Sequence, residues 1–314
     1  MGKMKTFLIT GGAGFIGANL IDRVLKENNR VICIDNFLLG KQENIIPFLT
    51  DVNFHFIEKD ITIIENLFDS IKDYEIDYVF HLAANSDIQL SGQDPLADYK
   101  STFLTTLSVL ECMRRKGIKK MFFSSSGAVY GEKPNSTLTE NSNLAPISYY
   151  GGSKMASEAF ISSYAHMNDL DVTIFRFPNV IGPHLTHGVI FDFIKKLKQN
   201  PKSLEVLGDG TQNKSYIFVQ DLIEAILMIA LSGDKGVNIY NIGGDGSTTV
   251  REIADMVCAK LGLKDVSYIY SGGDRGWKGD IPTFQFDVSK IHQRGWYAKH
   301  NSTEAVQATL DAIL

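Results

Sequence analysis

The chain has 314 residues, enough to bury one large core or two modest ones. Its 44% hydrophobic and 21% charged residues are typical of a globular protein, and a net charge of −5 excludes the basic footprint of a nucleic-acid-binding protein. The three cysteines lack metal-ligand spacing, and no apolar run is long enough to span a bilayer, so we expect a cytoplasmic protein without a metal site.

Strands and helices are predicted to alternate through the first half of the chain. Apolar, β-rich runs predict strands at 6–10, 30–35, 53–58, 78–82, 120–124 and 172–177. Amphipathic patterns predict helices at 15–26, 63–72, 94–116 and 149–167. This alternation is typical of right-handed βαβ units, with a parallel sheet that helices cover on both faces.

After Pro178 the predicted elements are shorter and are separated by turn-rich segments. Helices are predicted at 191–199, 219–232 and 249–261, without a regular sheet. We therefore expect an α/β fold with a doubly wound parallel sheet in residues 1–178. Residues 179–314 should form a smaller C-terminal substrate lobe, some segments of which pack back on the first domain. Ligands of open α/β sheets bind in a cleft at the carboxyl ends of the strands.

A glycine-rich loop follows the first predicted strand and opens the first predicted helix. Gly11 or Gly12 allows a tight turn, Gly14 lets the backbone approach a pyrophosphate, and Gly17 allows close packing of the helix on the sheet. Asp35 ends the second strand, roughly 20 residues further on, where a carboxylate accepts ribose hydroxyls. That carboxylate would repel a 2′-phosphate, so the pattern favours NAD over NADP.

Three hydroxyl- and amine-bearing residues predict a catalytic centre. Tyr150 and Lys154 are four residues apart at the start of a predicted helix, so they lie on one face of it. A nearby ammonium favours the phenolate, which predicts a lowered pKa for the tyrosine. Ser126 ends a run of serines at the carboxyl end of the fifth strand, where its hydroxyl can bind a substrate oxygen.

Taken together, these motifs resemble the extended short-chain dehydrogenase/reductases. The likeness is strongest to their nucleotide-sugar epimerase/dehydratase branch, enzymes such as UDP-glucose 4-epimerase, whose cofactor is NAD, and it covers nearly the whole chain. The matching stretches are TGGAGFIG (10–17), Asp35-Asn36, Asp60-Ile61, HLAA (81–84), SSSGAVYG (124–131), SYYGGSK (148–154), RFPNVIGP (176–183), SYIFVQD (215–221) and YNIGG (240–244).

The resemblance implies a role for each matching residue. Ser126 would hold the reacting oxygen, Tyr150 would act as the general base, and Lys154 would bind the nicotinamide ribose. Substrate would also contact Asn179, Lys214 and Arg275, with Lys278 as a weaker candidate and Phe284 as an aromatic residue of either the sugar pocket or the core. Besides Tyr150 and Lys154, NAD would contact Gly11, Gly14, Phe15, Ile16, Gly17, Asp35, Asn36, Asp60, Ile61, Leu82, Ala83, Ala84, Thr102 and Phe177.

The chain departs from the family pattern in two places. The family's Asn-Val-x-Gly-Thr stretch is replaced by residues 101–106, so a cofactor contact made by asparagine either passes to Thr102 or is lost. Dehydratases of this group carry an Asp-Glu pair after the catalytic hydroxyl residue, and this chain has Gly127-Ala128 there. Elimination of water is therefore disfavoured.

The sequence favours an NAD-dependent nucleotide-sugar 4-epimerase that works through a 4-keto intermediate in carbohydrate biosynthesis. The first alternative is a net 4-dehydrogenase that releases the keto sugar, and the second alternative is a 4-keto reductase. A 4,6-dehydratase and a non-catalytic NAD sensor are less favoured. The long helices at 94–116 and 149–167 resemble the pair that forms a four-helix dimer interface in this family, which predicts a homodimer.

Overall fold

The computed structural model describes residues 4–87, 91–92, 94–133, 136–273, 275–276, 279–281, 283 and 285–314. Internal contacts divide the chain into two compact units, each built from three segments. Residues 130–145 belong to the second unit and residues 223–240 to the first. The division at residue 178 into a cofactor domain and a substrate lobe stays a prediction. The first unit comprises Met1–Val129, Pro146–Arg176 and Ile223–Tyr240, and the second Tyr130–Ala145, Phe177–Leu222 and Asn241–Leu314.

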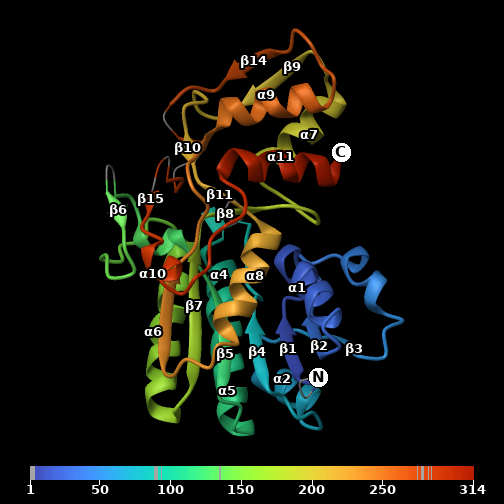
Figure 1. Cartoon of the computed structure of the whole chain (residues 1–314), viewed down its shortest axis with the longest axis vertical. Coiled ribbons are helices and arrows are strands. Elements are labelled where there is room, and N and C mark those ends of the chain that lie inside the picture. Colours follow the sequence, from blue (N-terminus) through green and yellow to red (C-terminus); the bar gives the residue numbers. More distant parts are fainter. Residues whose placement is uncertain are drawn as a thin grey trace. The chain divides into compact units, whose positions relative to one another are not determined.

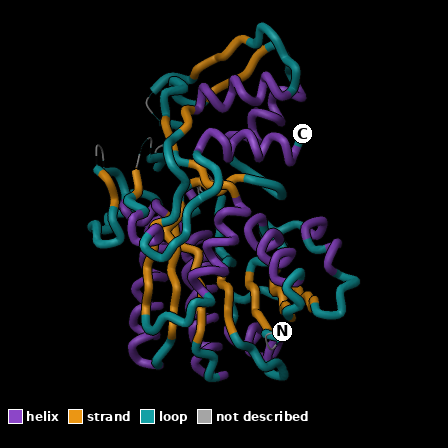
Figure 2. The backbone as a smooth tube through the Cα atoms, in the orientation of Figure 1, coloured by secondary structure: helices purple, strands orange, loops and turns teal. Residues whose placement is uncertain are grey.

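A seven-stranded sheet organises the first unit (Figure 2), and its order is β12-β7-β5-β4-β1-β2-β3. β1 pairs in parallel with both β2 and β4, so the strand order changes direction next to β1. This is the Rossmann-type doubly wound arrangement, and the predicted fold class is confirmed. The strands are β1 (Thr6–Thr10), β2 (Arg30–Asp35), β3 (Phe54–Glu58), β4 (Tyr78–His81), β5 (Lys120–Ser126), β7 (Asp171–Phe177) and β12 (Val237–Asn241).

The strand β12 was not predicted. It follows Gly236 in the part of the chain where no regular sheet was expected, yet it extends the large sheet beyond β7. Its first three residues are only half-buried, so it lacks the continuous apolar run that marks the central strands. An edge strand of this kind gives a weak signal in the sequence.

Helices cover both faces of the large sheet (Figure 1). Side chains of α2, α5 and α6 pack with Leu8, Val79 and Phe123 in one core cluster. On the opposite face, rings from neighbouring strands form a row in which Phe80 and Phe122 lie 6.1 Å apart and Phe122 and Phe175 5.1 Å apart. The longer helices among the described residues of this unit are α1 (Phe15–Leu25), α2 (Ile64–Ile71), α4 (Pro95–Asp98), η3 (Tyr99–Leu104), α5 (Thr105–Lys116), α6 (Tyr149–Asn168) and most of α8 (Val219–Ala230).

The long helix predicted at 94–116 is interrupted. Residues Tyr99–Leu104 (η3) form a π-helical segment between α4 and α5. The hydroxyl of Thr105 donates to the carbonyls of Ser101 and Thr102, both at 3.0 Å, and the hydroxyl of Thr106 donates to Thr102 at 2.8 Å. These hydroxyls compete for the carbonyls of the regular ladder, which explains the widened turn.

The second unit contains two-stranded sheets packed with short helices. The sequence analysis predicted short helices here but none of these strands. The main core cluster of this unit joins α7, α9 and α11 to β9. The paired strands are β6 (Thr137–Leu138) with β15 (Gln285–Phe286), β8 (Asn179–Ile181) with β11 (Tyr216–Phe218), β9 (Ser203–Val206) with β14 (Ser267–Tyr270), and β10 (Asn213–Lys214) with β13 (Thr248–Thr249). Its helices include α7 (Val189–Gln199), α9 (Val250–Lys260), α10 (Ser289–His292) and the unpredicted α11 (Ser302–Ile313).

Short 3₁₀ turns complete the described structure at Gln42–Asn44 (η1), Ile46–Phe48 (η2) and Gly127–Tyr130 (η4). Among the described helices, none has both the length and the apolar character needed to cross a membrane.

Candidate active site

The glycine loop joins β1 to α1 and leaves the start of that helix open. Gly11 has a φ of +72°, and a Cβ atom built on it would lie 2.6 Å from the backbone nitrogen of Ala83. Gly14 is the N-cap of α1 and carries no capping side chain, so the first amides of the helix have no side-chain partner there. Such a cradle fits the pyrophosphate of a dinucleotide, which binds where backbone comes close and N–H groups converge.

Asp35 lies beside this loop, at the carboxyl end of β2. Its carboxylate accepts hydrogen bonds from the backbone of Ala13 at 3.0 Å and of Phe37 at 2.8 Å. Burial raises the pKa of Asp35, although these backbone hydrogen bonds oppose the rise. The acid is therefore fixed at the position where a carboxylate would accept ribose hydroxyls, and it fits NAD rather than a cofactor with a 2′-phosphate.

The other predicted cofactor residues follow the ends of neighbouring strands. Asp60 accepts from the backbone of Thr62 at 2.9 Å, and the next residue, Ile61, is buried. Thr102 is fully buried, and its hydroxyl accepts from the backbone of Asn85 at 3.1 Å. Thr102 therefore supports the segment after β4 that also carries Leu82, Ala83 and Ala84, while Asn36 is exposed after β2.

The structure brings Ser126, Tyr150 and Lys154 together. Ser126 is the last residue of β5, and its hydroxyl lies close enough to the phenol of Tyr150 on α6 to lower the pKa of that phenol. The Lys154 amine lies 5.8 Å from the centre of the Tyr150 ring. It is only 2% exposed and donates to the carbonyl of Ser124 at 2.6 Å. A phenol, an amine and a hydroxyl thus converge at the carboxyl edge of the sheet.

Local sequence fixes the start of α6 against the end of β5. Ser148 caps the helix and accepts from the backbone of Gly151 at 3.1 Å. A Cβ atom built on Gly151 would lie 2.5 Å from the carbonyl oxygen of Ala128, two residues after Ser126. Only glycine therefore allows this close approach, and the approach carries Tyr150 to Ser126.

The pKa of Tyr150 is shifted in the direction opposite to the predicted one. Burial raises the pKa of Tyr150 to about 12, against the effect of the Ser126 hydroxyl, and the charge of Asp98 raises it further. Burial also lowers the pKa of Lys154 to about 7, although Glu158 and Asp98 favour its charged form. The predicted lowering of the tyrosine pKa is therefore wrong, because burial of the phenol outweighs the opposing effect of Ser126.

A buried polar network that the sequence analysis missed supports this centre. Glu158, one turn beyond Lys154, pairs with Arg176 at 2.5 Å and accepts from the hydroxyl of Ser125. His81 on β4 bonds Thr10 at 2.7 Å, and burial lowers the pKa of His81 to about 3, so its ring is neutral. The signal was present in the sequence, since Glu158 continues the four-residue spacing of Tyr150 and Lys154 along a buried helix face.

Apart from Ser126, the described residues that were predicted to bind substrate lie in the second unit. Asn179 begins β8, and Lys214 forms an ion pair with Asp280. The other oxygen of Asp280 accepts from the backbone of Gly276 at 3.0 Å, next to Arg275. Arg275 itself pairs with Glu132 at 3.1 Å. The remaining predicted residue, Phe177, ends β7 and is buried, while Lys278 and Phe284 lie outside the described residues.

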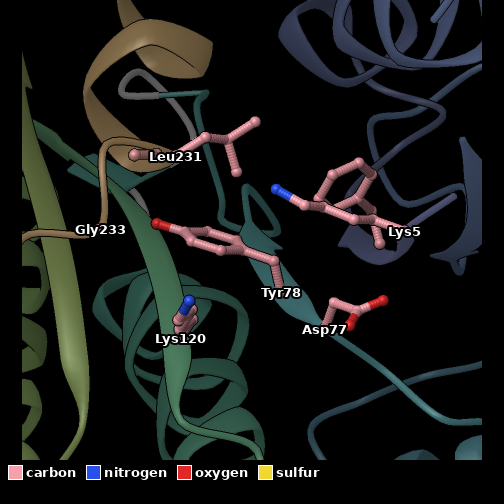
Figure 3. A pocket seen from close by; sticks show the side chains of 8 residues that line it. Lys5, Asp77, Tyr78, Lys120, Leu231 and Gly233 are labelled. Carbon is pink, nitrogen blue, oxygen red and sulfur yellow. The ribbon is translucent and has the colours of Figure 1, made fainter. Parts of the chain in front are cut away.

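A small cavity at the opposite ends of the strands is a separate feature (Figure 3). It has a volume of about 100 Å³ and lies where β1, β4 and β5 begin, whereas ligands of such sheets bind at the carboxyl ends. Its acid, Asp77, already accepts from the backbone of Thr6 at 2.8 Å. The cavity is lined by Lys5, Phe7, Asp77, Tyr78, Lys120, Ala230, Leu231 and Gly233.

The doubly wound sheet, the glycine cradle and the Tyr150–Lys154 pair together define a class, the extended short-chain dehydrogenases/reductases that use NAD. Comparison with known proteins agrees with this class. Residues 7–243 match the NAD-dependent epimerase/dehydratase family, and the chain belongs to that family.

Similar proteins extend over nearly the full chain. A putative UDP-glucose 4-epimerase of Methanocaldococcus jannaschii is 33% identical, with 97% of each chain covered. The solved structure of a UDP-glucose 4-epimerase from Thermotoga maritima with UDP-glucose is 30% identical, with 98% of each chain covered and a TM-score of 0.89. A dTDP-glucose 4,6-dehydratase from Streptomyces venezuelae, solved with NAD, is 26% identical over 98% of this chain and 96% of its own, with a TM-score of 0.89.

The first prediction concerns the adjacent glycines of α6. Gly151→Ala should lower the free energy of unfolding by about 1–3 kcal/mol, because its methyl group would overlap the carbonyl of Ala128. Gly152→Ala is the matched control, since no atom lies within 4 Å of a Cβ atom there and alanine favours helix. Urea unfolding without ligands measures both changes. Equal stabilities would contradict the close approach of α6 to the end of β5.

The second prediction concerns the buried amine. Lys154 has a pKa of about 7 in the folded protein and an ordinary value of 10.5 when unfolded. Between these values the unfolded chain binds more protons, so the free energy of unfolding should increase as pH rises from 7 towards 10. Lys154→Met should be more stable than the parent at pH 7 and should lose this part of the pH dependence. Denaturant titrations of both proteins across that range test it, and parallel curves would contradict a buried amine.

Proposed function

We propose that the protein is a nucleotide-sugar 4-epimerase, which oxidises C4 of a nucleoside-diphosphate sugar and reduces it again from the other face. The convergence of Ser126 and Tyr150, with the Lys154 amine one helical turn away and 5.8 Å from the Tyr150 ring, carries this proposal. The similarity to UDP-glucose 4-epimerases over nearly the whole chain supports it, and it makes UDP-sugars the first substrates to test.

The glycine loop and Asp35 would hold the cofactor. The amides at the start of α1 would bind the pyrophosphate. The Asp35 carboxylate would accept hydrogen bonds from the hydroxyls of the adenosine ribose. Bound there, NAD supplies the acceptor, and later the donor, of the hydride at C4.

The chain's own residues move the proton. The Tyr150 oxygen takes the proton of the C4 hydroxyl as the C4–H bond breaks and the carbonyl forms, and the Ser126 hydroxyl donates to the same sugar oxygen. The ammonium of Lys154 favours the phenolate during this step. When hydride returns to the opposite face of the keto sugar, Tyr150 gives the proton back. No atom is gained or lost overall, and only the configuration at C4 changes.

The residues after Ser126 favour epimerisation over dehydration. Gly127 and Ala128 occupy the first positions of η4, where the resemblance places the acid pair of a dehydratase. The backbone of Ala128 donates to the Ser126 hydroxyl at 3.2 Å, which fixes that hydroxyl without a carboxylate. Expulsion of a sugar hydroxyl needs a proton donor, and these two residues supply none.

We also propose that the protein is a homodimer through the helical segment 94–116 and α6. Phe160 and Met167 on α6 are 42% and 77% exposed, and Tyr99 in η3 is 47% exposed. Apolar side chains exposed along a helix in this way favour contact with a second copy. Light scattering after size-exclusion chromatography gives the mass of the assembly in solution.

The third prediction tests the base. UDP-, dTDP-, GDP- and CDP-sugars incubated with NAD should include one pair that the protein interconverts at C4, as seen by mass spectrometry and proton NMR. Tyr150→Phe should lower that turnover at least about 100-fold while NAD still binds, because only the proton acceptor is removed.

Tyr149→Phe is the matched control for that prediction, because the neighbouring Tyr149 is exposed. It should keep the parent rate. Full activity of Tyr150→Phe would exclude this base. Accumulation of reduced cofactor with a released keto sugar would indicate a net 4-dehydrogenase instead.

A further inference from the structure

Asp98 is a buried acid that the proposed mechanism does not use. It ends α4, directly before the π-helical segment, and is completely buried. One carboxylate oxygen, Oδ1, accepts from the side-chain amide of Asn85 at 3.1 Å. The nearby hydroxyl of Ser91, which donates to the carbonyl of Asp87 at 3.0 Å, lowers the pKa of the carboxyl group. The other oxygen, Oδ2, has no hydrogen-bond partner among the described residues. A buried oxygen without a donor costs stability, so it calls for an explanation.

Asp98 ends α4, and both α4 and η3 pack against α6, the helix that carries Tyr150 and Lys154. The charge of Asp98 acts on both of these residues. Asp98 raises the pKa of Lys154, because a carboxylate favours the ammonium, and raises the pKa of Tyr150, because it disfavours the phenolate. Burial raises the pKa of Asp98, whereas its hydrogen bonds and the charge of Lys154 lower it. The π-helical segment after Asp98 is a local distortion of the kind often found at functional sites.

Other charged groups near the pair are committed elsewhere. Glu158 on α6 also acts on Lys154, but its carboxylate pairs with Arg176 and accepts from Ser125. His81 on β4 interacts with Lys154 as well, but the low pKa of its ring keeps it neutral. Lys154 is the cation whose charge lowers the pKa of Asp98, so the two groups act as a buried pair of opposite charge.

We propose that Asp98 is a positioning residue whose buried carboxylate keeps Lys154 charged and sets the pH range in which Tyr150 exchanges its proton. The proposal rests on the proposed function, in which Tyr150 moves that proton. Without Asp98, Lys154 loses an attraction and Tyr150 loses a repulsion, so both groups should titrate at lower pH. If Asp98 served only in packing, its removal would leave the titration midpoints of Lys154 and Tyr150 unchanged.

The first test needs no turnover. Lysine labelled with ¹³C at Cε is incorporated, and the NMR signal of Lys154 is assigned by its loss in Lys154→Met. Asp98→Asn keeps the shape of the side chain and removes its charge. Its Lys154 signal should titrate about 0.5–1 pH unit below that of the parent. An unchanged midpoint in a folded Asp98→Asn protein would overturn the proposal.

Two further variants control this test. Asp94→Asn removes the same charge from the exposed N-cap of α4 and keeps a capping side chain, so its Lys154 midpoint should not move. Ser91→Ala is the milder variant should Asp98→Asn fail to fold. It removes a neighbouring hydroxyl that lowers the pKa of Asp98, and should shift the midpoint in the same direction by less. An unmoved midpoint in Ser91→Ala would then count against the proposal.

The second test uses the pH dependence of turnover on the sugar identified for the parent protein. Both limbs of the kcat profile should move to lower pH in Asp98→Asn and stay in place in Asp94→Asn. A lower kcat with unmoved limbs would assign Asp98 a structural part and overturn the proposal. Absence of turnover by the parent protein on every nucleotide sugar would instead refute the proposed function, and the NMR titration would still decide on Asp98.

Discussion

The burial of one amine, that of Lys154, governs the arrangement of this centre. Removing an ammonium from water is costly, and the protein opposes that cost with the carbonyl of Ser124 at 2.6 Å and the face of the Phe123 ring at 4.9 Å. Both partners belong to β5. The helix α6 is therefore tied to the strand through its lysine, and the four-residue spacing then brings Tyr150 to Ser126. Burial of the Lys154 amine costs stability, but it places the amine next to the phenol of Tyr150.

The strands provide a rigid base for this contact. The hydroxyl of Ser126, the Asp35 carboxylate and the glycine loop all lie at carboxyl ends of strands in one parallel sheet, so backbone hydrogen bonds fix their spacing. Two glycines make the close approaches possible. Gly11 lets the loop meet Ala83 after β4, and Gly151 lets α6 meet the turn after β5. Enzymes with different reactions can use such a frame, because the reaction depends on the residues placed around the site and not on the fold.

Much of the fold could be predicted from the sequence. The central strands have continuous apolar runs, and the glycine loop and the Tyr150–Lys154 spacing are local patterns, so their elements were predicted to within a few residues. The edge strand β12 was missed because its residues are half-buried, and the π-helical segment because hydroxyl-to-carbonyl bonds are not visible as periodicity. The direction of the Tyr150 pKa could not be predicted either, since it depends on burial, which a spacing does not report.

The most direct measurement tracks the hydrogen at C4. A UDP-sugar that carries deuterium at C4 is incubated with the protein and NAD, and the product is analysed by mass spectrometry and NMR. If the protein removes the C4 hydride and returns it to the same carbon, the epimer keeps its deuterium at C4. An epimer with solvent hydrogen at C4 would contradict the account, because the inversion would then proceed through loss of a proton from carbon.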